Sequence, residues 1–172
     1  MRKLIVIGTL HAGLTPEEEL IEAIKKCSPN QLLIEIAEKD IKKNKIEAYP
    51  SEMIAAYKWA IKNKIRVDGF DSKINTLKEG MTEKDNQAAI KEQKKIMKEF
   101  TWKDMNKPEN NKKLKIDAAK RLIDYKKEEK RDIEMLQNIN NQMITDGVIV
   151  IVTGCRHLDF FEKNLKAFFP YR

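Results

Sequence analysis

Four short apolar segments are spread along the chain, and each predicts a β-strand. Residues 4–8, 32–36 and 148–153 are rich in isoleucine, leucine and valine, and residues 65–71 form a shorter segment that ends in an acid. Continuous runs of this kind are typical of strands that are buried on both faces, as in parallel sheets. The pattern therefore predicts a small, mainly parallel β-sheet.

Segments with helical spacing of apolar residues separate these strands. Thr15 is placed to cap a helix whose first position suits Pro16, and an apolar face continues to Cys27. Residues 51–64 predict a second helix. The helix after the last strand is predicted to include Phe160, Phe161, Leu165 and Phe168. This alternation of strand and helix predicts right-handed βαβ units.

The stretch from about residue 82 to about residue 145 contains no convincing strand. Its periodicity predicts two long charged helices, one running to about Phe100 and one from about Lys112 to Thr145, with a turn at residues 106–111. The predicted fold is a single α/β domain over residues 1–172. Helices flank its small parallel sheet, and a long helical insertion precedes the last strand.

Composition argues against several classes of partner. The net charge of +7 comes mainly from lysines, but acidic residues are interleaved with them and no arginine cluster or aromatic platform accompanies them, so nucleic acid is not an expected partner. No apolar stretch approaches the roughly 20 residues that span a bilayer, and no signal peptide is evident. The two cysteines form no CxxC pair. The sequence predicts a soluble, cytoplasmic protein without a membrane partner.

The chain has two histidines, and each ends a Gly-x-x-His motif that follows an apolar segment. These are His11 and His157. A glycine at the end of a strand allows a sharp turn and a close approach of the backbone to a ligand. Glu35 and Asp71 lie near the ends of two further predicted strands. Because the carboxyl ends of parallel strands share one edge, the four side chains are expected to converge there.

Two imidazoles with one or two carboxylates suit two kinds of chemistry. They are typical ligands of a divalent metal ion such as Zn²⁺, Mn²⁺ or Co²⁺, which would polarise a carbonyl or activate a bound water. They would equally support hydrolysis without a metal, with a histidine as base and a carboxylate orienting it. Glu35 needs a partner in its apolar strand, and a structural arginine or lysine would also serve. Cys155 is interpreted as a small buried spacer rather than as a nucleophile.

Motifs along nearly the whole chain resemble the TraB/PrgY family. Its wider superfamily includes the TIKI and GumN proteins, erythromycin esterases and the haem-binding ChaN lipoproteins. The segments that resemble family motifs, in consistent order, are residues 7–11 with 16–19 (the opening), 33–36 (V-x-V-E-L), 70–77 (D-R-x-I-x-x-T-L), 130–135 (E-R-D-x-x-M) and 152–158 (the closing strand and G-x-x-H-L). Ser72 stands where the family usually has arginine.

The resemblance implies a hydrolase-like site at which His11, Glu35, Arg131 and His157 are catalytic, with Glu35 as the base or as a metal ligand. Arg131 would supply a fixed cation for a substrate carboxylate, phosphate or oxyanion. TIKI-like members are regarded as metal-dependent proteases, and erythromycin esterases as hydrolases that need no metal. Peptides, esters or other small anionic molecules are therefore the implied substrates. If a metal is used, His11, Glu35, Asp71 and His157 would bind it.

Two alternatives stay open at this point. The first is a binding module without chemistry, in which the same edge of the sheet holds an anionic ligand, haem or a signalling peptide. The second gives the main role to the charged helices of the insertion at about residues 82–145, which would then form the interface of a homodimer.

Overall fold

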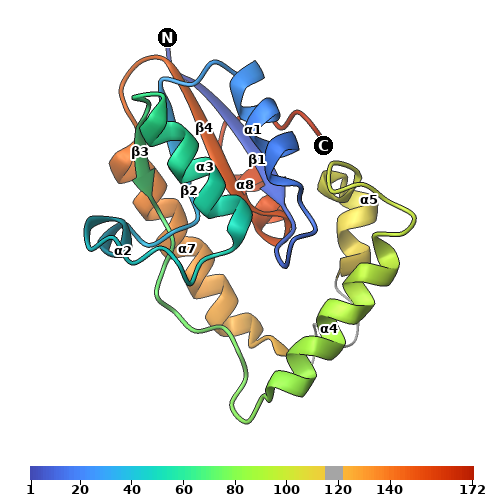
Figure 1. The fold of residues 1–172 in the computed structure, drawn as a ribbon. Helices are drawn as coiled ribbons and strands as arrows, with labels where there is room; N and C mark the ends of the chain where they lie inside the picture. Colours follow the sequence, from blue (N-terminus) through green and yellow to red (C-terminus); the bar gives the residue numbers. More distant parts are fainter. Residues whose placement is uncertain (115–121) are drawn as a thin grey trace.

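Four parallel strands form the sheet, as predicted from the apolar segments. The computed structural model describes residues 1–114 and 122–172. The strands are β1 (Lys3–Thr9), β2 (Gln31–Ile34), β3 (Arg66–Gly69) and β4 (Val148–Gly154). Their order in the sheet is β1-β4-β2-β3, so the last strand is inserted between the first two (Figure 1).

The register of the strands brings their carboxyl ends to one edge. Thr9 at the end of β1 pairs with Gly154 at the end of β4. Ile34 at the end of β2 pairs with Val152 on one side and with Gly69 on the other. The residues that follow these ends therefore leave the sheet close to one another, at the position where open parallel sheets place their ligand sites.

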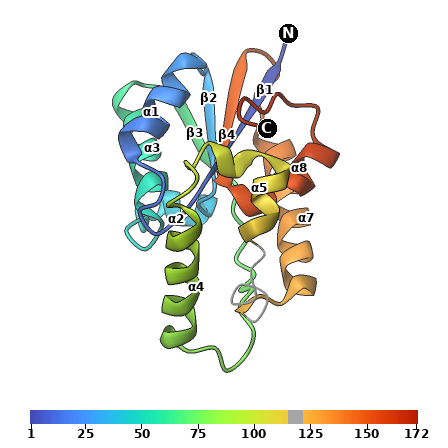
Figure 2. The same cartoon turned by 90° about the vertical axis from the view of Figure 1, so that its right-hand side faces the viewer.

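Helices cover both faces of the sheet. α1 and α3 lie on one face, and α7 and α8 lie on the other (Figure 2). The helices are α1 (Glu17–Lys26), α2 (Glu38–Lys42), α3 (Ser51–Lys62), α4 (Glu83–Ile96), α5 (Pro108–Asn111), α7 (Tyr125–Gln142) and α8 (Leu158–Asn164), with 3-10 turns at Asp104–Asn106, Lys112–Leu114 and Cys155–His157. The small α/β fold with helices before its last strand is thus confirmed.

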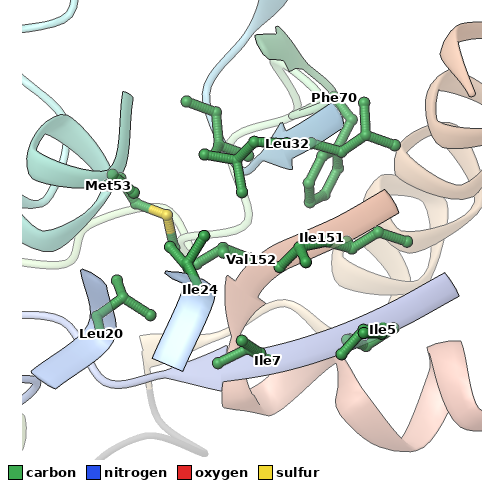
Figure 3. Close-up of a cluster of buried hydrophobic side chains, with 14 of the residues drawn as sticks. Ile5, Ile7, Leu20, Ile24, Leu32, Met53, Phe70, Ile151 and Val152 are labelled. Carbon is green, nitrogen blue, oxygen red and sulfur yellow. The ribbon is translucent and has the colours of Figure 1, made fainter. Parts of the chain in front are cut away.

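Apolar side chains from both helical layers meet the sheet in one core. Leu20 and Ile24 of α1 and Met53 of α3 belong to the same buried cluster as Val152 of β4 (Figure 3). On the other face, Phe161 of α8 meets Phe70 edge to face, with ring centroids 6.2 Å apart. Burying each large side chain of this kind stabilises the fold by about 1.5–3 kcal/mol. The core therefore holds the sheet edge rigidly.

The second long helix of the insertion is not continuous from Lys112 to Thr145, as the sequence had predicted. α7 begins only at Tyr125, because the Asp124 carboxylate accepts hydrogen bonds from the backbone N–H groups of Lys126 and Lys127 and so caps the helix there. Just before it, Ile123 forms a β-bridge with Leu77. Residues 115–121 of the predicted helix lie outside the described residues.

Residues 106–111, predicted as a turn between two helices, contain the single-turn helix α5 and contribute buried asparagines. Asn106 is buried, and its side-chain amide exchanges two hydrogen bonds with the backbone of Gly8, at 2.9 and 3.0 Å. Asn111 donates to the carbonyl of Cys155 at 2.6 Å. The insertion therefore fastens the ends of β1 and β4, because these amides satisfy buried backbone groups.

Two smaller predictions are corrected as well. Thr15 does not cap α1; its hydroxyl accepts a hydrogen bond from the backbone N–H of Leu10 at 2.7 Å and shapes the turn after β1. Phe168 is not helical, since α8 ends at Asn164 and Phe168 pairs with Ile5 at the outer edge of β1. None of the helices in residues 1–114 and 122–172 has the length and apolar composition of a membrane-spanning segment.

Candidate functional site

A cavity of about 320 Å³ lies where the strands end. All five residues that the sequence singled out line its wall, namely His11, Glu35, Asp71, Arg131 and His157. Gln93 of α4 and Leu114 also line it, so the insertion contributes to the cavity. Convergence of residues that are far apart in the sequence is what a parallel sheet predicts at its carboxyl edge.

Glu35 occupies the centre of this group and is almost fully buried. Its Oε2 accepts hydrogen bonds from the Thr153 hydroxyl at 2.7 Å and from the Gly154 N–H at 2.6 Å. Burial alone would raise the pKa of this carboxyl, but the charges of His157 and Arg131 outweigh it and hold the pKa well below its usual range. Glu35 is therefore a fixed anion around which the other groups are arranged.

Arg131 joins two of the carboxylates. Its Nη2 donates to Glu35 Oε1 at 2.9 Å and to Asp71 Oδ1 at 2.8 Å, and its Nε donates to the same Asp71 oxygen at 3.0 Å. Burial and the neighbouring charge of Glu35 raise the pKa of Asp71 to about 6, against the opposing effect of Arg131. The guanidinium of Arg131 thus compensates the negative charge of Glu35 more completely than that of Asp71.

His157 is held between two carboxylates. Its Nδ1 donates to Asp132 Oδ1 at 2.5 Å, and its Nε2 lies 3.5 Å from Glu35 Oε1. The 3-10 turn at the end of β4 places the ring there, and only 6% of the side chain is exposed. Burial would lower the pKa of this imidazole, but Glu35 and Asp132 raise it to about 10. His157 is therefore an imidazolium at neutral pH.

His11 faces the same space from the other side. It follows β1 in a tight turn in which Ala12 has a φ of 59° and Gly13 a φ of 72°. Its Nδ1 lies 2.6 Å from Glu52 Oε1, within hydrogen-bond distance. Its Nε2 lies beside Gly154, where an added Cβ would be only 3.2 Å away. Unlike His157, His11 leaves 45% of its side chain exposed. It is the imidazole that solvent or a substrate can reach.

The protonation of His157 makes stability depend on pH. The pKa of this ring is about 10 in the folded protein against a model value of 6.5, so its contribution is fully present below about pH 6.5 and is lost as the pH rises through 10. We expect the free energy of unfolding to fall by several kcal/mol, at most on the order of 5, between pH 7 and pH 10. Urea unfolding at a series of pH values measures this.

His157→Asn is the control for that experiment. Its side-chain amide can still donate to Asp132 but does not titrate, so the loss of stability above pH 7 should largely disappear. An equally steep loss in the variant would contradict the assignment of the charge to His157. Direct titration of the His157 ring in wild-type protein by nuclear magnetic resonance gives the same answer independently of the variant.

Cys155 has the passive role that the sequence indicated. Its side chain is buried at the start of the 3-10 turn, and burial raises the pKa of its thiol to about 12. A thiol with this pKa supplies almost no thiolate at neutral pH, and the thiolate is the nucleophilic form.

Two carboxylates hold the two imidazoles: sequence reasoning did not notice Glu52, and it took Asp132 for a surface charge. Both lie on the apolar stripe of their helices. Glu52 precedes the buried Ala56 and Ala60 by four and eight residues, and Asp132 precedes the buried Met135 by three. A carboxylate on a buried stripe needs a partner, and this helical spacing is the signal that would have found both.

The donors do not fit a metal centre in this arrangement. Across residues 1–114 and 122–172, no three histidine, cysteine, aspartate or glutamate side chains are placed to hold a metal ion. Glu35 uses both oxygens as hydrogen-bond acceptors, and the guanidinium of Arg131 lies between Glu35 and Asp71. A positive charge at that position opposes a second cation. The metal hypothesis stays a prediction of the sequence.

In comparisons with protein-family models, curated proteins and solved structures, no match to this chain was found. The resemblance to the TraB/PrgY family therefore stays a prediction, and the function is argued from the geometry of the site.

Proposed function

We propose that the protein is a hydrolase of small esters or peptides that activates water without a resident metal. One observation carries the proposal. Two imidazoles line the same cavity, and a buried carboxylate holds the Nδ1 of each. A carboxylate on Nδ1 fixes the tautomer and the orientation of a catalytic histidine, as in the catalytic triads of hydrolases.

The two histidines would have different roles because their surroundings differ. His11 is the accessible ring and is the proposed base, with Nε2 taking a proton from the attacking water. His157 is held as a cation and is the proposed acid, which gives its proton to the departing alcohol or amine. Pairs of titratable groups in different environments commonly divide acid and base work in this way.

The cavity supports a small substrate. Its volume of about 320 Å³ is at the lower end of the range for ligand pockets. Apolar side chains, Leu10, Pro50 and Leu114, lie in the same wall as the charged groups. The cations of His157 and Arg131 would favour the oxyanion that forms when water adds to a carbonyl carbon.

Hydrolysis of p-nitrophenyl acetate and of a set of short fluorogenic peptides tests the proposal. We expect turnover of at least one of these probes by the wild-type protein, with the same rate in the presence of excess EDTA. No turnover of any probe would contradict hydrolytic function. Turnover that EDTA abolishes and that added zinc, manganese or cobalt restores would contradict the metal-free part.

The dependence of rate on pH has an expected form. The pKa of His11 is raised because Glu52 and Glu35 outweigh the effect of desolvation, and the base must be neutral to act. Rates should therefore rise as the pH passes this raised value and fall again near pH 10, where His157 loses its proton. The profile reports the coupled site as a whole.

A further inference from the structure

The burial of Glu52 is energetically unfavourable, and the packing of the fold does not explain it. It lies in the first turn of α3, and its side chain is fully buried. Its Oε1 meets His11 Nδ1 at 2.6 Å, whereas its Oε2 is buried without a hydrogen-bond partner among residues 1–114 and 122–172. Burying an ionisable group with half of its bonding capacity unused is unfavourable. Stability of the fold gives no reason for a carboxylate at this position.

The His11 side chain lies on an exposed turn, so a partner that fixes its orientation would matter there. His11 is half exposed, and the two residues after it have positive φ angles. An exposed side chain on such a turn has several rotamers available and loses entropy when it is fixed. Glu52 reaches it from a helix whose own side chains are packed in the core, so the helix provides a rigid support.

The two imidazoles are supported in the same way from opposite sides. Glu52 belongs to α3 on one face of the sheet, and Asp132 belongs to α7 on the other (Figure 2). Each carboxylate places one oxygen within hydrogen-bond distance of the Nδ1 of one histidine, at 2.6 Å and 2.5 Å. The two imidazoles are thus held by a matched pair of carboxylates, one from each helical layer.

We propose that Glu52 is a positioning residue, which keeps the proton of His11 on Nδ1 and leaves Nε2 unprotonated beside the cavity. The importance of Glu52 for catalysis rests on the proposed hydrolytic function. Its effect on the tautomer of His11 is independent of that function. Free histidine in its neutral form prefers the proton on Nε2, the opposite tautomer, so the two states are distinguishable without any substrate.

Long-range ¹H–¹⁵N spectra of the imidazole rings provide the test, because the chain contains only two histidines and a His11→Asn variant assigns them. The spectra are recorded at a pH where the His11 ring is neutral. In the wild type we expect His11 to show the Nδ1–H tautomer. In Glu52→Met, which has a similar length but no acceptor, we expect conversion to mostly Nε2–H.

Two further variants separate positioning from general disruption. Glu52→Gln keeps an amide oxygen that can accept from Nδ1, so it should keep more of the Nδ1–H tautomer than Glu52→Met does. Asp132→Asn alters the partner of the other ring, so it should shift the His157 signals and leave those of His11 unchanged. We expect both Glu52 variants to fold, since Oε2 contributes no hydrogen bond to the described residues.

The outcomes separate this proposal from the hydrolytic one. A wild-type His11 ring with its proton on Nε2, or a Glu52→Met spectrum identical to the wild type, would overturn the positioning role whether or not hydrolysis is found. The expected tautomer change in a protein that hydrolyses no probe would uphold the positioning role and reject the hydrolase. For an active protein, Glu52→Met should lower kcat at least tenfold, with a smaller effect in Glu52→Gln.

Discussion

His11→Asn is expected to reduce kcat/KM for any probe that the wild type hydrolyses by roughly 100- to 10,000-fold, the usual contribution of a general base. Asparagine places its amide nitrogen near the position of the imidazole Nδ1, so it can still donate to Glu52. It has no atom in the place of Nε2, which lies beside Gly154. The variant therefore removes the proposed base and keeps its anchor. Initial rates at low substrate concentration measure the change.

The control for this prediction is the stability of the same variant. Because the His11 side chain is 45% exposed, its free energy of unfolding should stay within about 1 kcal/mol of the wild type. Loss of activity together with unfolding would favour a structural role for His11 instead. An active, well-folded His11→Asn would show that another group takes the proton.

Arg131→Met is expected to destabilise the fold by about 3–5 kcal/mol, because breaking a buried ion pair leaves a charge without its partner. Arg131 makes hydrogen bonds to both Glu35 and Asp71, and only 20% of its side chain is exposed. Methionine fills much of the same volume, so the loss of stability would come from the lost charge and not from a new cavity. Protonation of Asp71 would relieve part of the cost. Urea unfolding at pH 7 measures it.

Arg156→Met is the matched control for that substitution. Arg156 pairs with Glu128 at 2.6 Å, but this pair is more exposed, with 31% of the arginine side chain accessible. Partly exposed ion pairs contribute little, so this variant should lose about 1 kcal/mol or less. Equal losses in the two variants would contradict the view that Arg131 has a special position between two buried carboxylates.

The sheet and its carboxyl edge are predictable from the sequence because their signals are local. Apolar β-branched runs mark the strands, and parallel topology then brings the following residues together. Glu35 in an apolar strand already required a partner, which is Arg131 in the structure. The resemblance to a known family pointed to the same arginine, although its role in binding a substrate stays a prediction.

Other parts of the site depend on contacts that no local pattern contains. Glu52 and His11 are separated by 41 residues, and their meeting depends on how α3 packs beside the turn after β1. Asn106 has a composition typical of turns, yet it binds the backbone of Gly8 in the core. Asparagine is common in turns because its side-chain amide hydrogen-bonds the nearby backbone. The same amide can equally bond a backbone group that is distant in the sequence.

The insertion shows why helical periodicity alone does not locate where a helix begins. A charged amphipathic pattern continues through residues 112–145, but α7 starts only after Asp124, where a capping carboxylate competes with helix propagation. The β-bridge between Ile123 and Leu77 is a second competitor, and it depends on a segment far away in the sequence. Tertiary contacts of this kind override local propensity.

The most direct test of the account compares the hydrolysis of p-nitrophenyl acetate by three proteins in the presence of EDTA. These are the wild type, His11→Asn and Glu47→Gln, which changes an exposed carboxylate outside the cavity lining. We expect equal rates for the wild type and Glu47→Gln, well above the rate without protein, and a rate at least 100-fold lower for His11→Asn. Equal rates for all three proteins, or no rate above that without protein, would contradict it.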